Sequence, residues 1–107
     1  MYDLTYRPRR LRTSPEMRDL VRETTLDTTD LIYPLFIVPG EGIKKEIDTL
    51  PGQYHLSVDE AVKVAQEAYD LGIRGVEIFG IPTYKDEQGS SAWDMEQPVQ
   101  QAITAIR

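Results

Sequence analysis

Apolar positions in the last three quarters of the chain fall into four segments with two different periods. The run "LIYPLFIV", residues 31–38, is almost entirely apolar, is rich in β-branched and aromatic residues, and ends at Pro39 and Gly40. This pattern is typical of a strand buried on both faces. Pro34 has no N–H to donate, so we expect its nitrogen to face a gap, a bulge or an unpaired side. "GVEIFGI", residues 75–81, predicts a second buried strand that carries one charge, Glu77.

The other two segments have helical spacing. One apolar stripe consists of Val58, Ala61, Val62, Ala65, Ala68 and Tyr69. Ser57 and Glu60 before it form a capping-box pattern and Gly72 supplies a stop, so we predict a helix over residues 58–71. Apolar residues also recur at helical spacing in "PVQQAITAIR", where the initial proline suits a first turn. This pattern predicts a second helix over residues 98–107.

Polar segments separate these elements. Residues 41–56 carry both signs of charge and a Pro51-Gly52 turn signal, which we interpret as an excursion from the sheet that could hold a short hairpin. Residues 82–97 form a second polar loop. The order strand, helix, strand, helix indicates an α/β protein with a parallel sheet covered by helices. Two parallel strands cannot close a barrel, so the chain resembles the beginning of a longer domain.

Charge is distributed unevenly along the 107 residues. Residues 1–22 hold six arginines against Asp3, Glu16 and Asp19, which gives these residues a charge of +3. Because the whole chain has a net charge of −6, the remaining residues carry −9. We interpret residues 1–29 as an extended basic arm before an acidic body. Such an arm could bind nucleic-acid phosphates or dock on an acidic protein surface. Pro8 and Pro15 prevent a continuous helix and no stacking aromatic lies within the arginine cluster, which favours protein docking.

Composition narrows the class of protein. The chain is 40% apolar and 28% charged, which is typical of a soluble globular protein with one modest core. It has no cysteine, so it can form neither a disulfide nor a thiolate metal site by itself. No apolar run approaches the ~20 residues of a membrane span, and the N-terminus lacks the apolar core of a secretory signal. We therefore expect a cytoplasmic protein without membrane contact.

Few side chains are candidates for chemistry. A Schiff-base lysine requires an environment that removes water from its ammonium group. Lys44 and Lys45 lie on the polar excursion, where such residues are usually solvated. His55, the only histidine, lies just before the first predicted helix without a second ligand beside it, which indicates a surface or capping residue. Gly89-Ser90-Ser91 is a turn that lacks the spacing of a phosphate loop, so no nucleotide is expected.

Five segments resemble one family in order and spacing. They are "RPRRLR", "DLIYPLFI", "TLPG", "LGIRGVEIFGIP" and "KDEQGSSAWD". Together they resemble the N-terminal third of porphobilinogen synthase, also called 5-aminolevulinate dehydratase. The resemblance implies an arm followed by the first two βα units of a (βα)₈ barrel of the triosephosphate isomerase type. Such a barrel takes about 250 residues.

The resemblance also implies a reaction and an assembly. Family members condense two molecules of 5-aminolevulinate to porphobilinogen with loss of two waters, a lyase step toward heme and other tetrapyrroles. The arm implies a homo-oligomer, commonly an octamer, and the full-length enzymes use zinc or magnesium. The family's Schiff-base lysines and metal ligands lie on later strands, so this chain is expected to contain no catalytic, cofactor-binding or metal-binding residue.

Two hypotheses remain open at this point. The chain is a fragment of a porphobilinogen synthase, inactive alone, or it is an inactive barrel fragment that acts as an oligomerisation module. The lysines are Lys44, Lys45, Lys63 and Lys85, and none matches a Schiff-base position of the family. Lys85 follows the second strand, on the side of a barrel where active-site loops gather. We expect a loop residue near the rim of a site, and its contact with substrate is left open.

Overall fold

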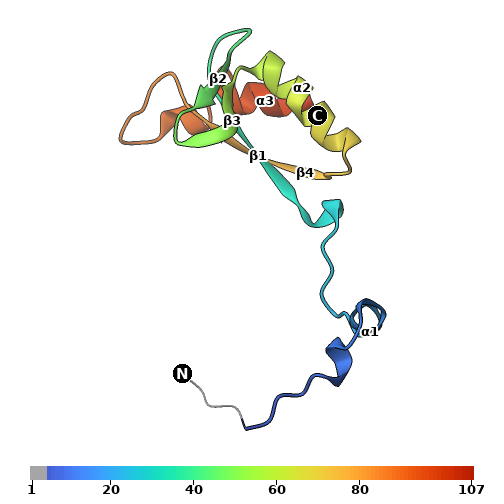
Figure 1. Ribbon diagram of the computed structural model, residues 1–107. Helices are drawn as coiled ribbons and strands as arrows, with labels where there is room; N and C mark the ends of the chain where they lie inside the picture. The colour runs from blue at the N-terminus through green and yellow to red at the C-terminus, as the bar shows by residue number, and fades with distance from the viewer. Residues whose placement is uncertain (1–4) are drawn as a thin grey trace.

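The computed structural model describes residues 5–107, and Tyr2 and Asp3 lie outside the described residues. The chain begins as an arm that stands away from the body (Figure 1). The arm contains a 3₁₀ turn at Arg10–Arg12, the short helix α1 at Pro15–Leu20 and a second 3₁₀ turn at Thr28–Asp30. The Ser14 hydroxyl caps α1 by accepting a hydrogen bond from the Met17 amide at 3.1 Å. Prolines thus limit helix formation in the arm, as the sequence predicts.

The body contains a four-stranded sheet in the order β2-β3-β1-β4. Strand β1 is Ile32–Ile37, β2 is Lys44–Ile47, β3 is Leu50–Leu56 and β4 is Gly75–Gly80. β1 and β4 are parallel over their full length. β2 and β3 form the antiparallel hairpin that the excursion was expected to accommodate, but its turn lies at Asp48 and Thr49, because Pro51 and Gly52 belong to β3. β3 also joins the sheet beside β1, with Phe36 opposite His55. That second role of β3 was not predicted.

Pro34 faces the incompletely paired side of β1. The Ile37 carbonyl accepts from the Ile81 amide on the β4 side, whereas the Val38 amide donates to Leu56 on the β3 side. Because successive residues of a strand direct their backbone groups to opposite sides, Pro34 points toward β3. β3 pairs with β1 only at Phe36 and Ile37, so the proline removes no ladder bond. The expectation that its nitrogen faces an unpaired side is confirmed.

Two helices cover one face of the sheet (Figure 1). Helix α2 is Val58–Asp70 and α3 is Pro98–Ile106, and all four predicted elements agree with the observed bounds to within one residue at each end. The core between sheet and helices consists of Leu35, Ile37, Leu56, Ala61 and Ala102. Small alanines on both helices allow close approach to the sheet. The sequence stripes therefore face the core.

The capping box predicted at the start of α2 is wrong. Ser57 is the N-cap residue and is fully buried, but its side chain makes no capping bond. Its hydroxyl accepts a hydrogen bond from the Ile43 amide at 2.9 Å and donates to the Asp59 carboxylate. Asp59 also accepts from the Gly42 amide at 3.0 Å. Ser57 and Asp59 therefore hold the turn after β1 to the beginning of α2.

Gly72 ends α2 as predicted. Its φ is +98°, a conformation that favours glycine, and the Ile73 amide donates to the Ala68 carbonyl across the end of the helix. A Cβ at Gly72 would lie 2.6 Å from Thr28 Oγ1. The root of the arm therefore packs against this turn.

Candidate functional site at the carboxyl ends of the strands

The face of the sheet opposite the helices carries an aromatic pair. The rings of Phe36 on β1 and Phe79 on β4 are stacked, with centroids 5.5 Å apart and an interplanar angle of 19°. His55 on β3 shares the register of Phe36 and continues the row across the sheet. Phe79 is 46% exposed and Ile32 on the same face is 68% exposed. Within residues 5–107 no element covers this apolar face.

A loop at the carboxyl end of β4 is closed by one buried side chain. Gln97 is only 5% exposed, and its Oε1 accepts hydrogen bonds from the backbone amide of Thr83 at 2.9 Å and from its hydroxyl at 3.1 Å. Its Nε2 donates to Asp94 at 3.4 Å. Thr83 and Gln97 are the two ends of the loop. The glutamine therefore ties residues 83–97 into a closed unit beside α3.

Two aspartates order the interior of this loop. Asp86 accepts from the amides of Gln88 and Ser90 at 3.1 and 2.8 Å, and hydrogen bonding by the Ser90 hydroxyl and amide lowers the pKa of Asp86. Asp94 accepts from the Glu96 amide, which lowers the pKa of Asp94. The Tyr84 hydroxyl donates to Asp94 at 3.1 Å, and partial desolvation followed by this carboxylate raises the pKa of Tyr84.

Gly89 forms the predicted sharp turn in the same loop. Its φ is +65° and its ψ is +35°, a left-handed conformation that suits glycine. The serines after it serve the loop: the Ser90 amide donates to Asp86, and the Ser91 carbonyl accepts from Gln100 Nε2 at 3.3 Å. These contacts are those of a connection from strand to helix.

The lysines and the histidine considered from sequence are dispersed. Lys85 is exposed on the loop, and among the described residues no carboxylate lies within salt-bridge distance of it. Lys63 on α2 pairs with Glu60 at 2.8 Å, a contact that raises the pKa of Lys63. Lys44 lies over the Tyr54 ring at 4.9 Å. Only Lys45 and His55 are brought together, as register partners in the hairpin.

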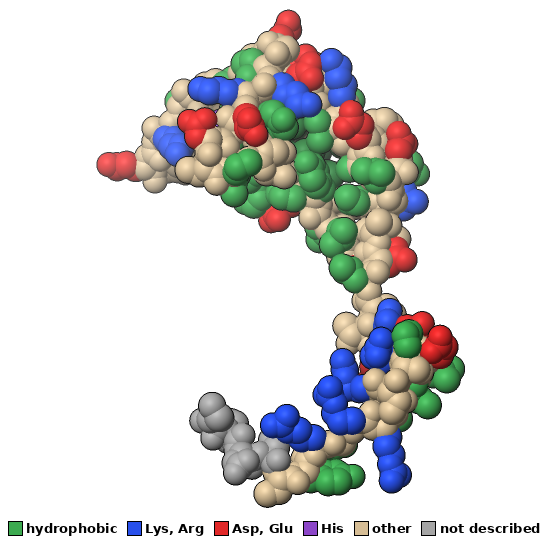
Figure 2. All heavy atoms as spheres, viewed as in Figure 1, with side chains coloured by type: hydrophobic (Ala, Val, Ile, Leu, Met, Phe, Trp, Pro, Cys, Tyr) green, Lys and Arg blue, Asp and Glu red, His purple; other side chains and the backbone are tan. Residues whose placement is uncertain are grey.

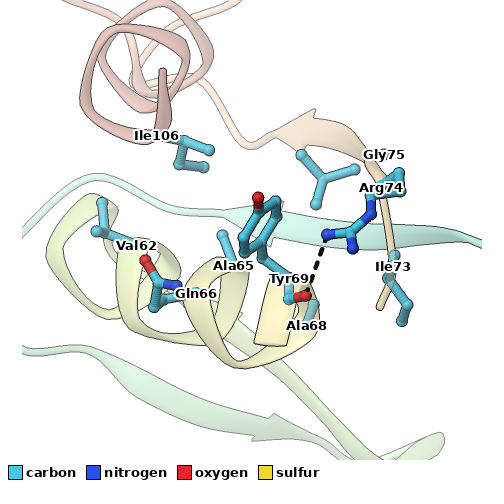
Figure 3. A pocket seen from close by; sticks show the side chains of 10 residues that line it. Val62, Ala65, Gln66, Ala68, Tyr69, Ile73, Arg74, Gly75 and Ile106 are labelled. Carbon is cyan, nitrogen blue, oxygen red and sulfur yellow. Dashed lines mark hydrogen bonds between the residues drawn. The ribbon is translucent and has the colours of Figure 1, made fainter. Parts of the chain in front are cut away.

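A hollow lies at the end of the sheet opposite the loop of residues 83–97. It has a volume of about 320 Å³ and is lined mainly by α2, the amino end of β4 and Ile106 (Figure 3). The Arg74 guanidinium stacks 4.6 Å from the Tyr69 ring centre and donates to the Tyr69 carbonyl at 3.5 Å. A cation at a helix C-terminus is stabilising. Sequence reasoning missed this contact, although a cation five residues beyond the last aromatic of the stripe was a visible signal.

The described residues do not fit the zinc that the resemblance implies for some full-length enzymes. A zinc site needs three or four nitrogen, sulfur or carboxylate ligands gathered at one point, whereas magnesium keeps several waters and needs only one or two carboxylates. No group of three or more His, Cys, Asp or Glu side chains lies close enough to hold a metal ion within residues 5–107. Over the same range no helix has the length and hydropathy to cross a membrane.

Comparison with known proteins identifies the family. The profile of the family described as "Delta-aminolevulinic acid dehydratase" matches residues 5–107. The chain belongs to this dehydratase family. A Synechococcus elongatus delta-aminolevulinic acid dehydratase is 54% identical over 103 residues, which are 96% of this chain and 32% of that protein. A Ruminiclostridium josui dehydratase is 50% identical over 94% of this chain and 49% of its own length.

A solved dehydratase structure shows the same fold. The porphobilinogen synthase of Toxoplasma gondii, crystallised with its reaction product porphobilinogen, superposes with a TM-score of 0.81 and 30% identity over 96% of this chain. The match covers 30% of that protein. The present chain thus spans about a third to a half of the length of these dehydratases. The predicted family and the partial barrel fold with an open sheet are confirmed.

Proposed function

We propose that this chain supplies the arm and the first two βα units of a porphobilinogen synthase. The complete enzyme would condense two molecules of 5-aminolevulinate to one porphobilinogen with release of two waters, in tetrapyrrole biosynthesis. The observation that carries the proposal is the family match over residues 5–107 together with the TM-score of 0.81. The family assignment also supports a cytoplasmic location for the enzyme.

The geometry suits a partial barrel. In a barrel the strands close on themselves and their inner faces pack together, so each strand needs partners on both sides. Within residues 5–107 the inner face with Phe36 and Phe79 is uncovered, and β4 has a neighbour only on its β1 side. The loop of residues 83–97 follows the carboxyl end of β4, where the catalytic loops of such barrels gather. The chain would therefore provide one wall and one rim loop of the active site.

The chain on its own is proposed to be inactive. Ketone activation by a lysine requires an amine kept unprotonated by burial or by nearby positive charge. Lys44, Lys45, Lys63 and Lys85 are all exposed. The Schiff-base chemistry is therefore assigned to the parts of the family enzymes that this chain does not match.

Complementation tests the proposal. The chain would be co-expressed with the remaining two thirds of the Synechococcus elongatus dehydratase in a bacterial strain that lacks its own enzyme. Growth without added tetrapyrrole, and porphobilinogen formation by the purified pair, are the expected results. A matched variant, Phe79→Asp, places a charge on the inner face and should abolish activity. The proposal would be contradicted if both polypeptides are soluble and the intact relative restores growth, but the pair does not.

Trapping tests the assignment of chemistry within the chain. Incubation of the chain alone with 5-aminolevulinate and borohydride should give no adduct at a defined lysine, and peptide mass spectrometry would detect one. Stoichiometric labelling of Lys85 would overturn the placement of the Schiff-base lysines outside this chain. Because Lys85 is exposed, any labelling is expected to be slight and shared with other surface lysines.

A second candidate is an interaction module without chemistry. The uncovered inner face and the free side of β4 favour it, since exposed apolar surface and unpaired strand edges promote association. Such a module would bind a full-length dehydratase subunit or a second copy. This candidate is excluded if the chain is monomeric, melts cooperatively and does not co-purify with a full-length relative. In either case the arm is the proposed route to a homo-oligomer, with an octamer as the expected state.

A further inference from the structure

The hollow at the amino end of β4 combines an apolar lining with a few polar side chains (Figure 3). Its apolar lining includes Val62, Ala65 and Ala68 on α2, Val76 on β4 and Ile106 on α3. Two of these side chains are alanines, which leave space between helix and strand. Small-molecule sites typically have volumes of about 300–1,000 Å³, apolar linings and a small number of placed polar groups. At about 320 Å³ the hollow has the size and lining of a site for a small ligand.

Arg74 at this hollow keeps most of its hydrogen-bond donors free. Its exposed guanidinium stacks on the Tyr69 ring, 4.6 Å from the ring centre. Within residues 5–107 its side chain makes one hydrogen bond, to the Tyr69 carbonyl at 3.5 Å, and no carboxylate lies within 4 Å of it. A guanidinium has five N–H donors. The aromatic ring therefore holds a cation in place beside the hollow and leaves donors available to a ligand.

These donors indicate which polar group the hollow would take. The planar fork of a guanidinium matches the two oxygens of a carboxylate, and such charge-assisted pairs are stronger than neutral hydrogen bonds. The Tyr69 ring and the Gln66 amide line the same hollow beside Arg74 (Figure 3). A ligand with one carboxylate and one apolar part would therefore match both the charge and the lining.

One acid adjoins this cation along the chain. Asp70 is the last residue of α2, and its carboxylate accepts a hydrogen bond from Gln66 Nε2 at 3.0 Å. Asp70 does not line the hollow and lies beyond salt-bridge distance of Arg74. Its charge opposes an anion only from a distance, whereas Arg74 would contact the anion directly. The attraction of Arg74 for a carboxylate is therefore reduced but not cancelled.

We propose that this hollow binds a small monocarboxylate with an aromatic or branched aliphatic body. The body would pack on Ala65, Ala68 and Val76, and the carboxylate would accept hydrogen bonds from Arg74. The hollow lies at the amino end of β4, whereas active-site loops of a barrel gather at the carboxyl ends of the strands. Such a ligand would therefore bind away from those loops, and the inference does not rest on the proposed enzymatic function.

Benzoate is a suitable probe because it joins one ring to one carboxylate. The full chain would be labelled with ¹⁵N and titrated with benzoate through the millimolar range. We expect the amide signals of Ala65, Ala68 and Gly75 and the Nε–H signal of Arg74 to shift together and to saturate. A Kd in the millimolar range or below suits a ligand of this size. Absence of saturable shifts at these residues would overturn the proposal, and so would shifts confined to the arm.

Charge variants test the role of the guanidinium. Arg74→Gln should raise the Kd for benzoate by about tenfold or more, and Arg74→Lys should recover only part of the loss, because an ammonium lacks the planar fork. Asp70→Asn should lower the Kd, since it removes a like charge. The matched control, Arg10→Gln, removes an exposed arginine from the arm, where basic side chains gather apart from the body (Figure 2), and should leave the Kd unchanged. An unchanged Kd in Arg74→Gln would overturn the proposal.

Related compounds test the match between ligand and lining. Benzamide lacks the charge, phosphate lacks an apolar body, and 5-aminolevulinate carries an ammonium instead of a ring. Each should bind at least about tenfold more weakly than benzoate. Equal binding of benzamide or of phosphate would overturn the proposal, because one of its two elements would then be unused. Ala65→Leu should fill the hollow and abolish binding while Arg74 remains, with circular dichroism to verify the fold. Retained binding in folded Ala65→Leu would place the ligand elsewhere.

Discussion

Replacing Ser57 by alanine should destabilise the body more than its size suggests. The side chain is fully buried, and its hydroxyl is the partner of the Ile43 amide at 2.9 Å. Ser57→Ala leaves that amide without the serine oxygen in a part-buried site. A buried donor left unsatisfied costs about 1–3 kcal/mol. Because a domain of this size has a free energy of unfolding of only about 5–15 kcal/mol, the change removes a substantial share of it.

Urea unfolding followed by circular dichroism would measure the effect. The control is Ser91→Ala, which changes a half-buried serine whose hydroxyl makes no hydrogen bond to a described residue. The midpoint should fall for Ser57→Ala with an unchanged slope, and Tm should fall by roughly 4–8 °C for each kcal/mol lost. Hydrogen exchange at the Ile43 amide should accelerate. A loss within about 0.5 kcal/mol of the control would refute the reasoning.

The same variant has a defined pH dependence. Hydrogen bonding by the Ser57 hydroxyl is the largest influence on the pKa of Asp59 and lowers it below the ordinary value of 3.8, and the Gly42 amide adds to this effect. A carboxyl with a lowered pKa in the folded state stabilises the protein above its unfolded pKa, and this contribution is lost as the pH falls through the folded pKa. The difference in stability between the parent and Ser57→Ala should therefore narrow when the pH is lowered past 3.8.

Two further substitutions test the loop and the contact between β4 and α3. Gln97→Ala should release the Thr83 amide and accelerate its hydrogen exchange, with a cost of about 1–3 kcal/mol, whereas Gln101→Ala on the exposed side of α3 should change neither. Gly80→Ala would place a Cβ 2.2 Å from Val99 Cγ2 and should cost about 1–3 kcal/mol in thermal unfolding. Val99→Ala should recover part of that loss, and simple additivity of the two changes would argue against the clash.

The sequence was sufficient for elements whose signal is local. The apolar run around Leu35 and the alanine stripe of α2 have the periods of a buried strand and of an amphipathic helix, and Gly72 has the freedom that a helix end needs. The resemblance then supplied the barrel topology. These predictions depend on residues within a few positions of one another, where backbone geometry fixes which side chains share a face.

Contacts between distant segments could not be predicted in this way. The capping pattern at Ser57 takes account only of neighbouring residues. In the structure the Ser57 hydroxyl instead accepts a hydrogen bond from the amide of Ile43, which lies 14 residues away. β3 joins β1 through two residues of a mostly polar segment whose pattern does not distinguish an excursion from a sheet strand. Gln97 closes the loop on Thr83, also 14 residues away. Each outcome depends on tertiary packing, which overrides local preference.

The two sides of the parallel β1 and β4 pair offer different hydrogen-bonding groups to a further parallel strand. The even-numbered residues of β1 face β3, and there the proline offers no donor, whereas β4 presents the amides and carbonyls of Val76, Ile78 and Gly80 on its free side. Among the described residues, β4 therefore offers a parallel strand a complete ladder, whereas a strand that closes a barrel against β1 would find no donor at Pro34. During synthesis the β1 and β4 pair would form a template that accepts the next parallel strand along the β4 edge.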